Sequence, residues 1–154
     1  MQSSTARDNY LATEVKTATP QRLQLLLIEA ALRLANRARQ YWQQGRDDLA
    51  LGALVNAQAV VAHMLAVIDR EAAGDLAQRV SAVYAFIYRS LVKAGHRHDE
   101  KGLADAVRIL EIERETWRLV CEKLAVNAPH ARFADGPHGV PDSLAMPGGF
   151  SVEA

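Results

Sequence analysis

The distribution of proline constrains this chain more than any other feature. Residues 20–126 contain one proline, Pro20, at their first position, whereas the last 28 residues hold four of the five prolines and four of the nine glycines. No stretch alternates apolar and polar residues like a strand, so the proline-free region favours helices. The sequence therefore predicts an all-α domain over residues 20–126, with an N-terminal arm (1–19) and a disordered Pro/Gly-rich tail (127–154).

Local signals divide the middle of the chain into four helices. Thr19-Pro20 is a typical start, because threonine caps free amides and proline suits the first helical position. Gly45 and Gly95 are expected to end helices, because glycine tolerates the left-handed conformation. The predicted helices run from Pro20 to Gly45, over 47–68, over 75–94 and from after Asp99 to Val126. Connections of about four to seven residues favour antiparallel neighbours, so we predict an antiparallel up-and-down four-helix bundle.

Charge and cysteine content exclude several classes of function. Eighteen Lys and Arg balance eighteen Asp and Glu. This balance argues against a nucleic-acid partner and against a polybasic membrane surface. The single cysteine, Cys121, excludes an intrachain disulfide and a cysteine-based metal site, and it favours a reducing compartment. The first ten residues contain no apolar stretch, so no signal peptide is predicted.

The second predicted helix carries more apolar surface than one bundle seam needs. Sixteen of the twenty residues over 49–68 are apolar. A membrane span is one interpretation, but Asn56, Gln58 and His63 and the lack of a second membrane signal argue against membrane insertion. We instead predict a core stripe and a second stripe that requires another cover. The core stripe is Leu54, Ala57, Val61, Met64 and Ile68, and the second stripe is Leu51, Val55, Ala62 and Leu65.

The other two helices of interest differ in their apolar patterns. The third helix also has two stripes, one with Leu76, Val80, Val83 and Ile87 and one with Ala77, Tyr84, Tyr88 and Leu91. Two such helices side by side indicate either a fully wrapped core or an apolar groove for a partner, and the pattern leaves both open.

The fourth helix has a single heptad seam, which only Arg114 interrupts. Cys121 lies in this seam and is expected to be a buried, inert thiol. That seam is Leu103, Val107, Leu110, Arg114, Trp117, Cys121 and Leu124.

Signatures of catalysis are missing from the sequence. It contains no phosphate-binding glycine loop, no GxSxG, no HExxH and no Glu-x-x-His pair, so we predict no enzyme, no cofactor and no metal site. His96 and His98 have ligand-like spacing but lack a strong third ligand. His63 raises an alternative from another class, because Ala62-His63-Met64-Leu65 is similar to the phosphorylated segment of histidine phosphotransfer bundles. Ala66 and Val67 stand where that family has lysine and glycine.

Several short segments, taken in order, resemble the flagellin-specific export chaperones of the FliS family over residues 9–124. The resemblance begins with Tyr10 and Val15 and continues with a Thr-Ala-Thr-Pro run that enters the first helix. The remaining matching segments are Ala31-Leu32-Arg33, Ala57-Gln58, Ile68-Asp69 before Gly74, Val83 to Leu91 with the sequence VYAFIYRSL, and Glu115-Thr116-Trp117.

The resemblance implies a function without catalysis. Such chaperones are cytoplasmic helical bundles that bind the disordered C-terminal segment of flagellin, prevent its premature polymerisation and present it to the flagellar export gate. The excess apolar stripes would then form a groove for partner helices, and the arm is expected to cover part of it when flagellin is absent. The residues expected to contact the partner are Tyr10, Val15, Leu23, Leu27, Gln58, Val61, Leu65, Tyr84, Tyr88 and Leu91. The phosphotransfer bundle that uses His63 and a purely structural bundle that self-associates are the competing interpretations.

Overall fold

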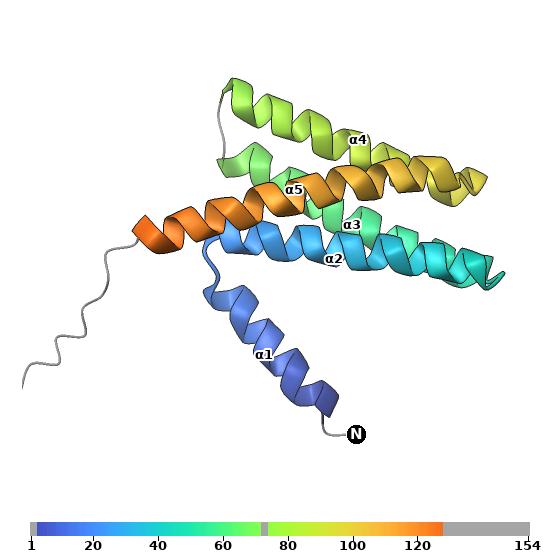
Figure 1. The fold of residues 1–154 in the computed structure, drawn as a ribbon, viewed down its shortest axis with the longest axis horizontal. Helices are drawn as coiled ribbons and strands as arrows, with labels where there is room; N and C mark the ends of the chain where they lie inside the picture. Colours follow the sequence, from blue (N-terminus) through green and yellow to red (C-terminus); the bar gives the residue numbers. More distant parts are fainter. Residues whose placement is uncertain (1–2, 72–73, 128–154) are drawn as a thin grey trace, which may run out of the picture.

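The computed structural model describes residues 3–71 and 74–127, and these residues form five helices and no strand (Figure 1). The helices are α1 (Ser3–Thr17), α2 (Pro20–Gln43), α3 (Asp47–Glu71), α4 (Asp75–Arg97) and α5 (Glu100–Asn127). Helices α2 to α5 run alternately up and down, which confirms the predicted antiparallel four-helix bundle. The predicted disordered tail lies outside the described residues, apart from Asn127, which is the last residue of α5.

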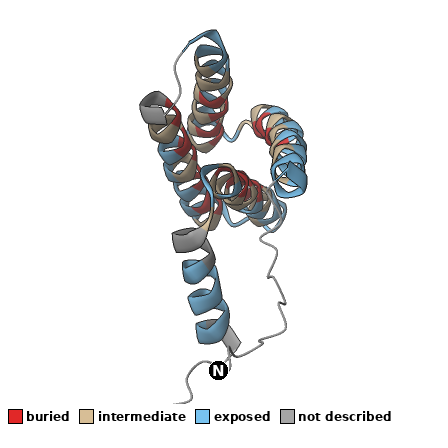
Figure 2. Ribbon diagram, turned by 90° about the vertical axis from the view of Figure 1, so that its left-hand side faces the viewer, coloured by how far each residue is buried: buried red, intermediate tan, exposed pale blue. Residues whose placement is uncertain are grey.

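The N-terminal arm is a helix that projects away from the bundle (Figure 1). Its described side chains are all exposed, as the pale blue turns in the middle of this helix show in Figure 2. Tyr10 is 71% exposed and Leu11 is exposed as well. Tyr10 and Leu11 therefore do not cover a groove in this structure, in contrast to the expectation for the arm, and the Val15 side chain lies outside the described residues.

Capping interactions set the ends of the bundle helices close to the predicted positions. The Thr19 hydroxyl accepts a hydrogen bond from the Arg22 amide at 3.2 Å, and Pro20 occupies the first turn of α2. Gly45 follows α2 with φ of +68°, the left-handed conformation that glycine adopts without strain. Asp99 caps α5, because its Oδ1 accepts a hydrogen bond from the Gly102 amide at 2.9 Å. This bond and the nearby Lys93 lower the pKa of Asp99.

The predicted end of the third helix at Gly95 is wrong. Helix α4 continues to Arg97 and ends at His98, which adopts the left-handed conformation with φ of 48°. A Cβ at Gly95 would lie 3.3 Å from Cδ1 of Leu51 and 3.9 Å from Nε2 of Gln58. Glycine at this position therefore allows α4 to approach α3 closely and is not a stop signal.

The bundle has a square cross-section in which each helix contacts two neighbours. The contacting pairs are α2–α3, α3–α4, α4–α5 and α2–α5. The α3–α4 edge and the α2–α5 edge therefore lie on opposite sides of the bundle, and the buried residues face its centre (Figure 2). The central side chains with the largest volume are Tyr84, Ile28, Leu54, Met64, Ile87, Leu91, Leu103, Leu110 and Val61.

The predicted core stripe of α3 is confirmed, because all five of its residues are buried. The predicted seam of α5 is confirmed only in its first half. Leu103, Val107 and Leu110 are buried, whereas Arg114 and Leu124 are exposed and Trp117 and Cys121 are half-buried. The expected fully buried thiol at Cys121 is therefore wrong, because α5 extends beyond the well-packed part of the bundle.

The apolar segment Asp47–Ile68 is long and apolar enough to cross a membrane by length and composition alone. In this structure it forms most of α3, which packs between α2 and α4. Its apolar surplus is divided between the core and the outer surface of the bundle.

Candidate partner-binding groove

A groove runs between the second half of α3 and the first half of α4. It has a volume of about 560 Å³ and its walls are mostly apolar or small side chains. Ala77, Ser81 and Ala85 recur every four residues along α4, so they form a shallow stripe beside Leu65 of α3. The residues that line this α3–α4 groove are Leu65, Ile68, Gly74, Ala77, Gln78, Ser81, Ala82 and Ala85.

The second stripe of α3 remains partly uncovered. Leu51 is 49% exposed and Val55 is 52% exposed, Ala62 is exposed, and Leu65 is half-buried against the core. The stripe ends at Leu65, which also lines the α3–α4 groove. Apolar surface from the stripe and from the groove therefore extends along the outer side of α3. The other helices of the bundle do not fully cover this side.

The structure divides the residues that were expected to contact a partner into three groups. Val61, Tyr84 and Leu91 have no exposed surface and belong to the core. The half-buried residues are Leu23 and Leu27 on α2, Gln58 and Leu65 on α3, and Tyr88 on α4. Tyr10 is exposed on α1, away from the groove, and the Val15 side chain lies outside the described part of the chain.

The hydroxyl of Tyr84 is saturated by internal hydrogen bonds. It accepts from Nε2 of the buried Gln24 at 2.8 Å and from Nε1 of Trp117 at 3.1 Å, and it donates to Oε2 of Glu113 at 3.3 Å. Burial, together with the nearby Glu113 carboxylate, raises the pKa of Tyr84 to about 12, although the bond from Gln24 opposes this shift. Tyr84 thus joins α2, α4 and α5 and has no free hydrogen-bonding capacity for a partner.

Outer surfaces that the site prediction omitted are also apolar. Leu76 and Phe86 on α4 and Ile112 and Leu119 on α5 are exposed. Leu51 and Val55 were recognised as a stripe but not named as contacts. Their spacing of four residues, which puts both on one face of the helix, is the sequence signal that identifies them as further candidate contacts.

The histidine, cysteine and carboxylate side chains of the described residues do not gather into a metal site. Within residues 3–71 and 74–127, no group of three or more His, Cys, Asp or Glu side chains is placed to hold a metal ion. His98 stacks on Trp42 with ring centroids 4.2 Å apart and lies 3.5 Å from Asp47 and 3.2 Å from Glu100. His63 is exposed on α3, and Ala66 and Val67, which follow it on the helix, carry no charge.

The fold and this surface place the chain among helical-bundle proteins that present an apolar groove on an outer edge. The family model described as "Flagellar protein FliS" matches residues 2–124. The chain therefore belongs to the FliS family.

Three curated relatives support this assignment, and each is described as a flagellar secretion chaperone FliS. The protein from Salmonella typhimurium is 31% identical over 111 residues, which are 71% of this chain and 82% of that protein. The protein from Bacillus subtilis is 27% identical over 109 residues, 71% of this chain and 80% of that protein. The protein from Vibrio cholerae is 21% identical over 105 residues, 68% of this chain and 77% of that protein.

Proposed function

We propose that this chain is a cytoplasmic chaperone that binds the disordered C-terminal segment of flagellin without catalysing a reaction. Binding would mask the segments through which flagellin polymerises and would hold it ready for the flagellar export gate. Membership of the FliS family and the description of its relatives as flagellar secretion chaperones support this role.

The uncovered apolar surface of α3 is the observation that carries the proposal. A segment that folds on binding loses several kcal/mol to ordering, so it requires a large apolar surface on its partner. The α3–α4 groove and the outer stripe of α3 form such a surface, and helical segments of the client would lie along it with apolar side chains inward.

We propose a smaller set of flagellin contacts than the sequence predicted. Leu65, Gln58 and Tyr88 remain because they reach the outer surface of α3 and α4, and Leu51 and Val55 join them. Leu23 and Leu27 lie on α2, where a client that wraps around the bundle would continue. Val61, Tyr84 and Leu91 act indirectly, because their buried side chains hold the helices that shape the groove.

Calorimetric titration of the full chain with the last 40 or so residues of flagellin from the same organism tests this proposal. We expect saturable one-to-one binding with a negative heat-capacity change, because roughly 2,000 Å² of surface would be buried. No detectable heat at tens of micromolar would contradict it.

A matched pair of variants tests the location. Ala82→Arg fills the groove from an exposed position on α4, and Ala125→Arg makes the same change at an exposed position near the end of α5. Ala82→Arg should weaken binding at least tenfold, while Ala125→Arg should leave it within about twofold. Equal effects of the two variants would place the client elsewhere.

A further inference from the structure

The edge of the bundle opposite the α3–α4 groove has a different chemistry. An open cleft of about 470 Å³ lies between α2 and α5, and three arginines, two carboxamides and one carboxylate line it together with one leucine. The lining residues are Glu29, Leu32, Arg33, Asn36, Arg37, Gln40 and Arg114. Three guanidinium groups against one carboxylate give this cleft local positive charge on a chain whose net charge is zero.

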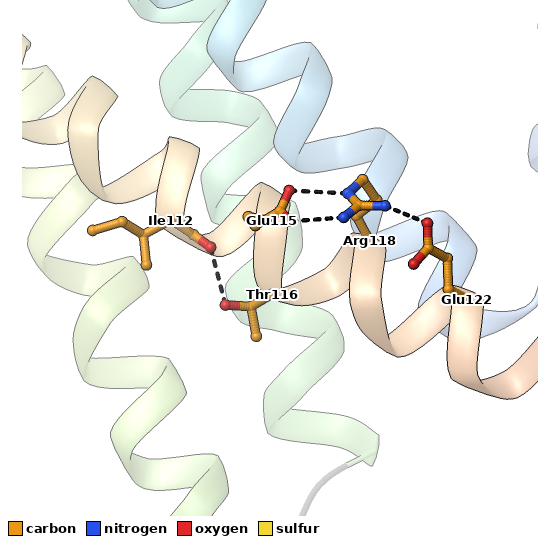
Figure 3. A network of polar contacts seen from close by, with 5 residues as sticks. All are labelled: Ile112, Glu115, Thr116, Arg118 and Glu122. Carbon is orange, nitrogen blue, oxygen red and sulfur yellow. Dashed lines mark hydrogen bonds and ion pairs between the residues drawn. The ribbon is translucent and has the colours of Figure 1, made fainter.

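The cleft arginines are not held by close ion pairs. Within the described helices, Arg33, Arg37 and Arg114 form no close ion pair, although the charge of Arg114 helps to lower the pKa of its neighbour Glu115. Arg118, one turn further along α5, is different, because Glu115 holds it with two hydrogen bonds and Glu122 with another (Figure 3). Two carboxylates therefore hold Arg118, whereas no carboxylate forms a hydrogen bond with a cleft arginine in the described helices.

The fold itself brings the positive charges together. Arg33 and Arg37 are four residues apart on α2, a spacing at which like charges repel each other. Arg114 adds a third positive charge from α5, in a heptad position where an apolar residue would be expected. An anionic ligand would relieve this repulsion.

The remaining lining residues indicate which kind of anion fits. Leu32 is almost completely buried and provides an apolar floor, while Asn36 and Gln40 offer neutral donors and acceptors that suit a peptide backbone. Glu29 at the wall repels any anion, and it opposes a compact dianion such as phosphate most, because a peptide can place its carboxylates away from Glu29. Among the described residues, no aromatic side chain lines the cleft, so this lining lacks the stacking platform that binds single-stranded nucleic acid. We propose that the α2–α5 cleft binds an acidic segment of a second protein, whose carboxylates pair with Arg33, Arg37 and Arg114.

The α2–α5 cleft would bind its partner independently of the α3–α4 groove. The two edges lie on opposite sides of the bundle and share no lining residue. A bound client and an acidic partner segment could therefore occupy the chain at the same time.

The test uses the full chain and a synthetic helical peptide with two glutamates four residues apart and a leucine between them. An otherwise identical peptide with glutamines in place of the glutamates is the control. The Nε–H signals of arginine in nuclear magnetic resonance spectra report which side chains respond. We expect saturable shifts of Arg33, Arg37 and Arg114 with the glutamate peptide and binding that weakens as salt rises. Equal binding of the glutamine peptide, or equal shifts of every exposed arginine, would overturn the proposal.

Variants on α2 test whether Arg33 and Arg37 bind the acidic peptide. Arg33→Gln combined with Arg37→Gln should weaken the peptide at least tenfold, and Glu29→Gln should strengthen it about twofold to fivefold. Arg39→Gln is the matched control, because Arg39 lies on α2 but lines another pocket, and it should change affinity less than twofold. Tighter binding of tripolyphosphate or a single-stranded RNA oligonucleotide than of the glutamate peptide to the same arginines would show that the ligand class is wrong.

Discussion

Helix α3 carries two apolar stripes of similar composition that have different environments. Leu54, Val61 and Met64 face the centre of the bundle and are buried, while Leu51 and Val55, only a few residues away, are about half exposed. The first stripe lowers the free energy of the folded bundle, because its apolar area leaves water on folding. The second leaves water only when something else covers it. The comparison shows that apolar composition alone does not distinguish stability from recognition.

Truncation of one leucine in each stripe should give the largest difference in the free energy of unfolding between two variants. Leu54→Ala removes a buried side chain and is expected to cost about 2–5 kcal/mol of unfolding free energy. Leu51→Ala truncates an exposed side chain and should cost less than about 1 kcal/mol. Urea unfolding followed by circular dichroism measures both values. Equal costs would mean that the two stripes do not differ as the structure shows.

Loss of one hydroxyl tests whether Tyr84 belongs to the core or to the groove. Tyr84→Phe should cost about 1–3 kcal/mol, because it leaves Gln24 and Trp117 without their acceptor. Thermal unfolding measures this loss, and flagellin binding at a temperature where the variant is folded should stay within about twofold. If Tyr84→Phe left stability unchanged and weakened flagellin binding strongly, Tyr84 would instead be a contact residue.

Truncation within the outer stripe should affect affinity more than stability. Val55→Ala is expected to weaken flagellin binding by about 1 kcal/mol, roughly fivefold, while unfolding changes by less than that. Calorimetry and urea unfolding of the same preparation separate the two effects. Ala125→Arg, on α5, serves as the control for nonspecific changes in affinity.

The smallest predicted effect concerns pH and Glu113. Burial raises the pKa of Glu113 above its ordinary value, against the opposing effect of the bond from Tyr84. Because the pKa of Glu113 is higher in the folded state than in the unfolded state, the folded protein holds the carboxyl proton more tightly. The resulting stabilisation is present at acidic pH and is lost as pH rises through the pKa of the folded state. Glu113→Gln, which stays neutral and still accepts from Tyr84, should therefore stabilise the protein at pH 7 by about 0.5 kcal/mol and by less near pH 4.

Urea midpoints of the parent and Glu113→Gln proteins at both pH values check this prediction. Glu115→Gln is a useful comparison, because hydrogen bonds from Arg118 lower the pKa of Glu115 and the pH dependence should have the opposite sign. The same sign for both variants would contradict the assigned environments.

Most of the bundle could be predicted from local signals. Thr19, Pro20, Gly45 and Asp99 mark helix ends through chemistry that depends on near neighbours, and the structure places them at those ends. Gly95 misled the prediction, because its role depends on Leu51 of another helix. The helical state of the arm was not foreseen, since its residues have no strong apolar period.

The candidate site was harder to predict than the fold. The two stripes of α3 were assigned correctly to core and outer surface, but three residues predicted as contacts, Val61 of α3 and Tyr84 and Leu91 of α4, are core residues. Their stripe and the neighbouring one are offset by one residue, so small changes in helix rotation decide which faces inward. The arginine cleft joins residues far apart in the sequence, so only the arrangement of α2 beside α5 brings Arg114 to Arg33 and Arg37.

Methyl nuclear magnetic resonance of the full chain, titrated with the C-terminal segment of flagellin, tests the central claim most directly. Signals of Leu and Val methyl groups report each stripe separately. We predict that Leu51, Val55 and Leu65 on α3 shift most, while Leu32 and Val120 on α2 and α5 shift little. Shifts confined to α2 and α5, with Leu51, Val55 and Leu65 unchanged at saturation, would contradict the claim that the outer stripe of α3 binds the client.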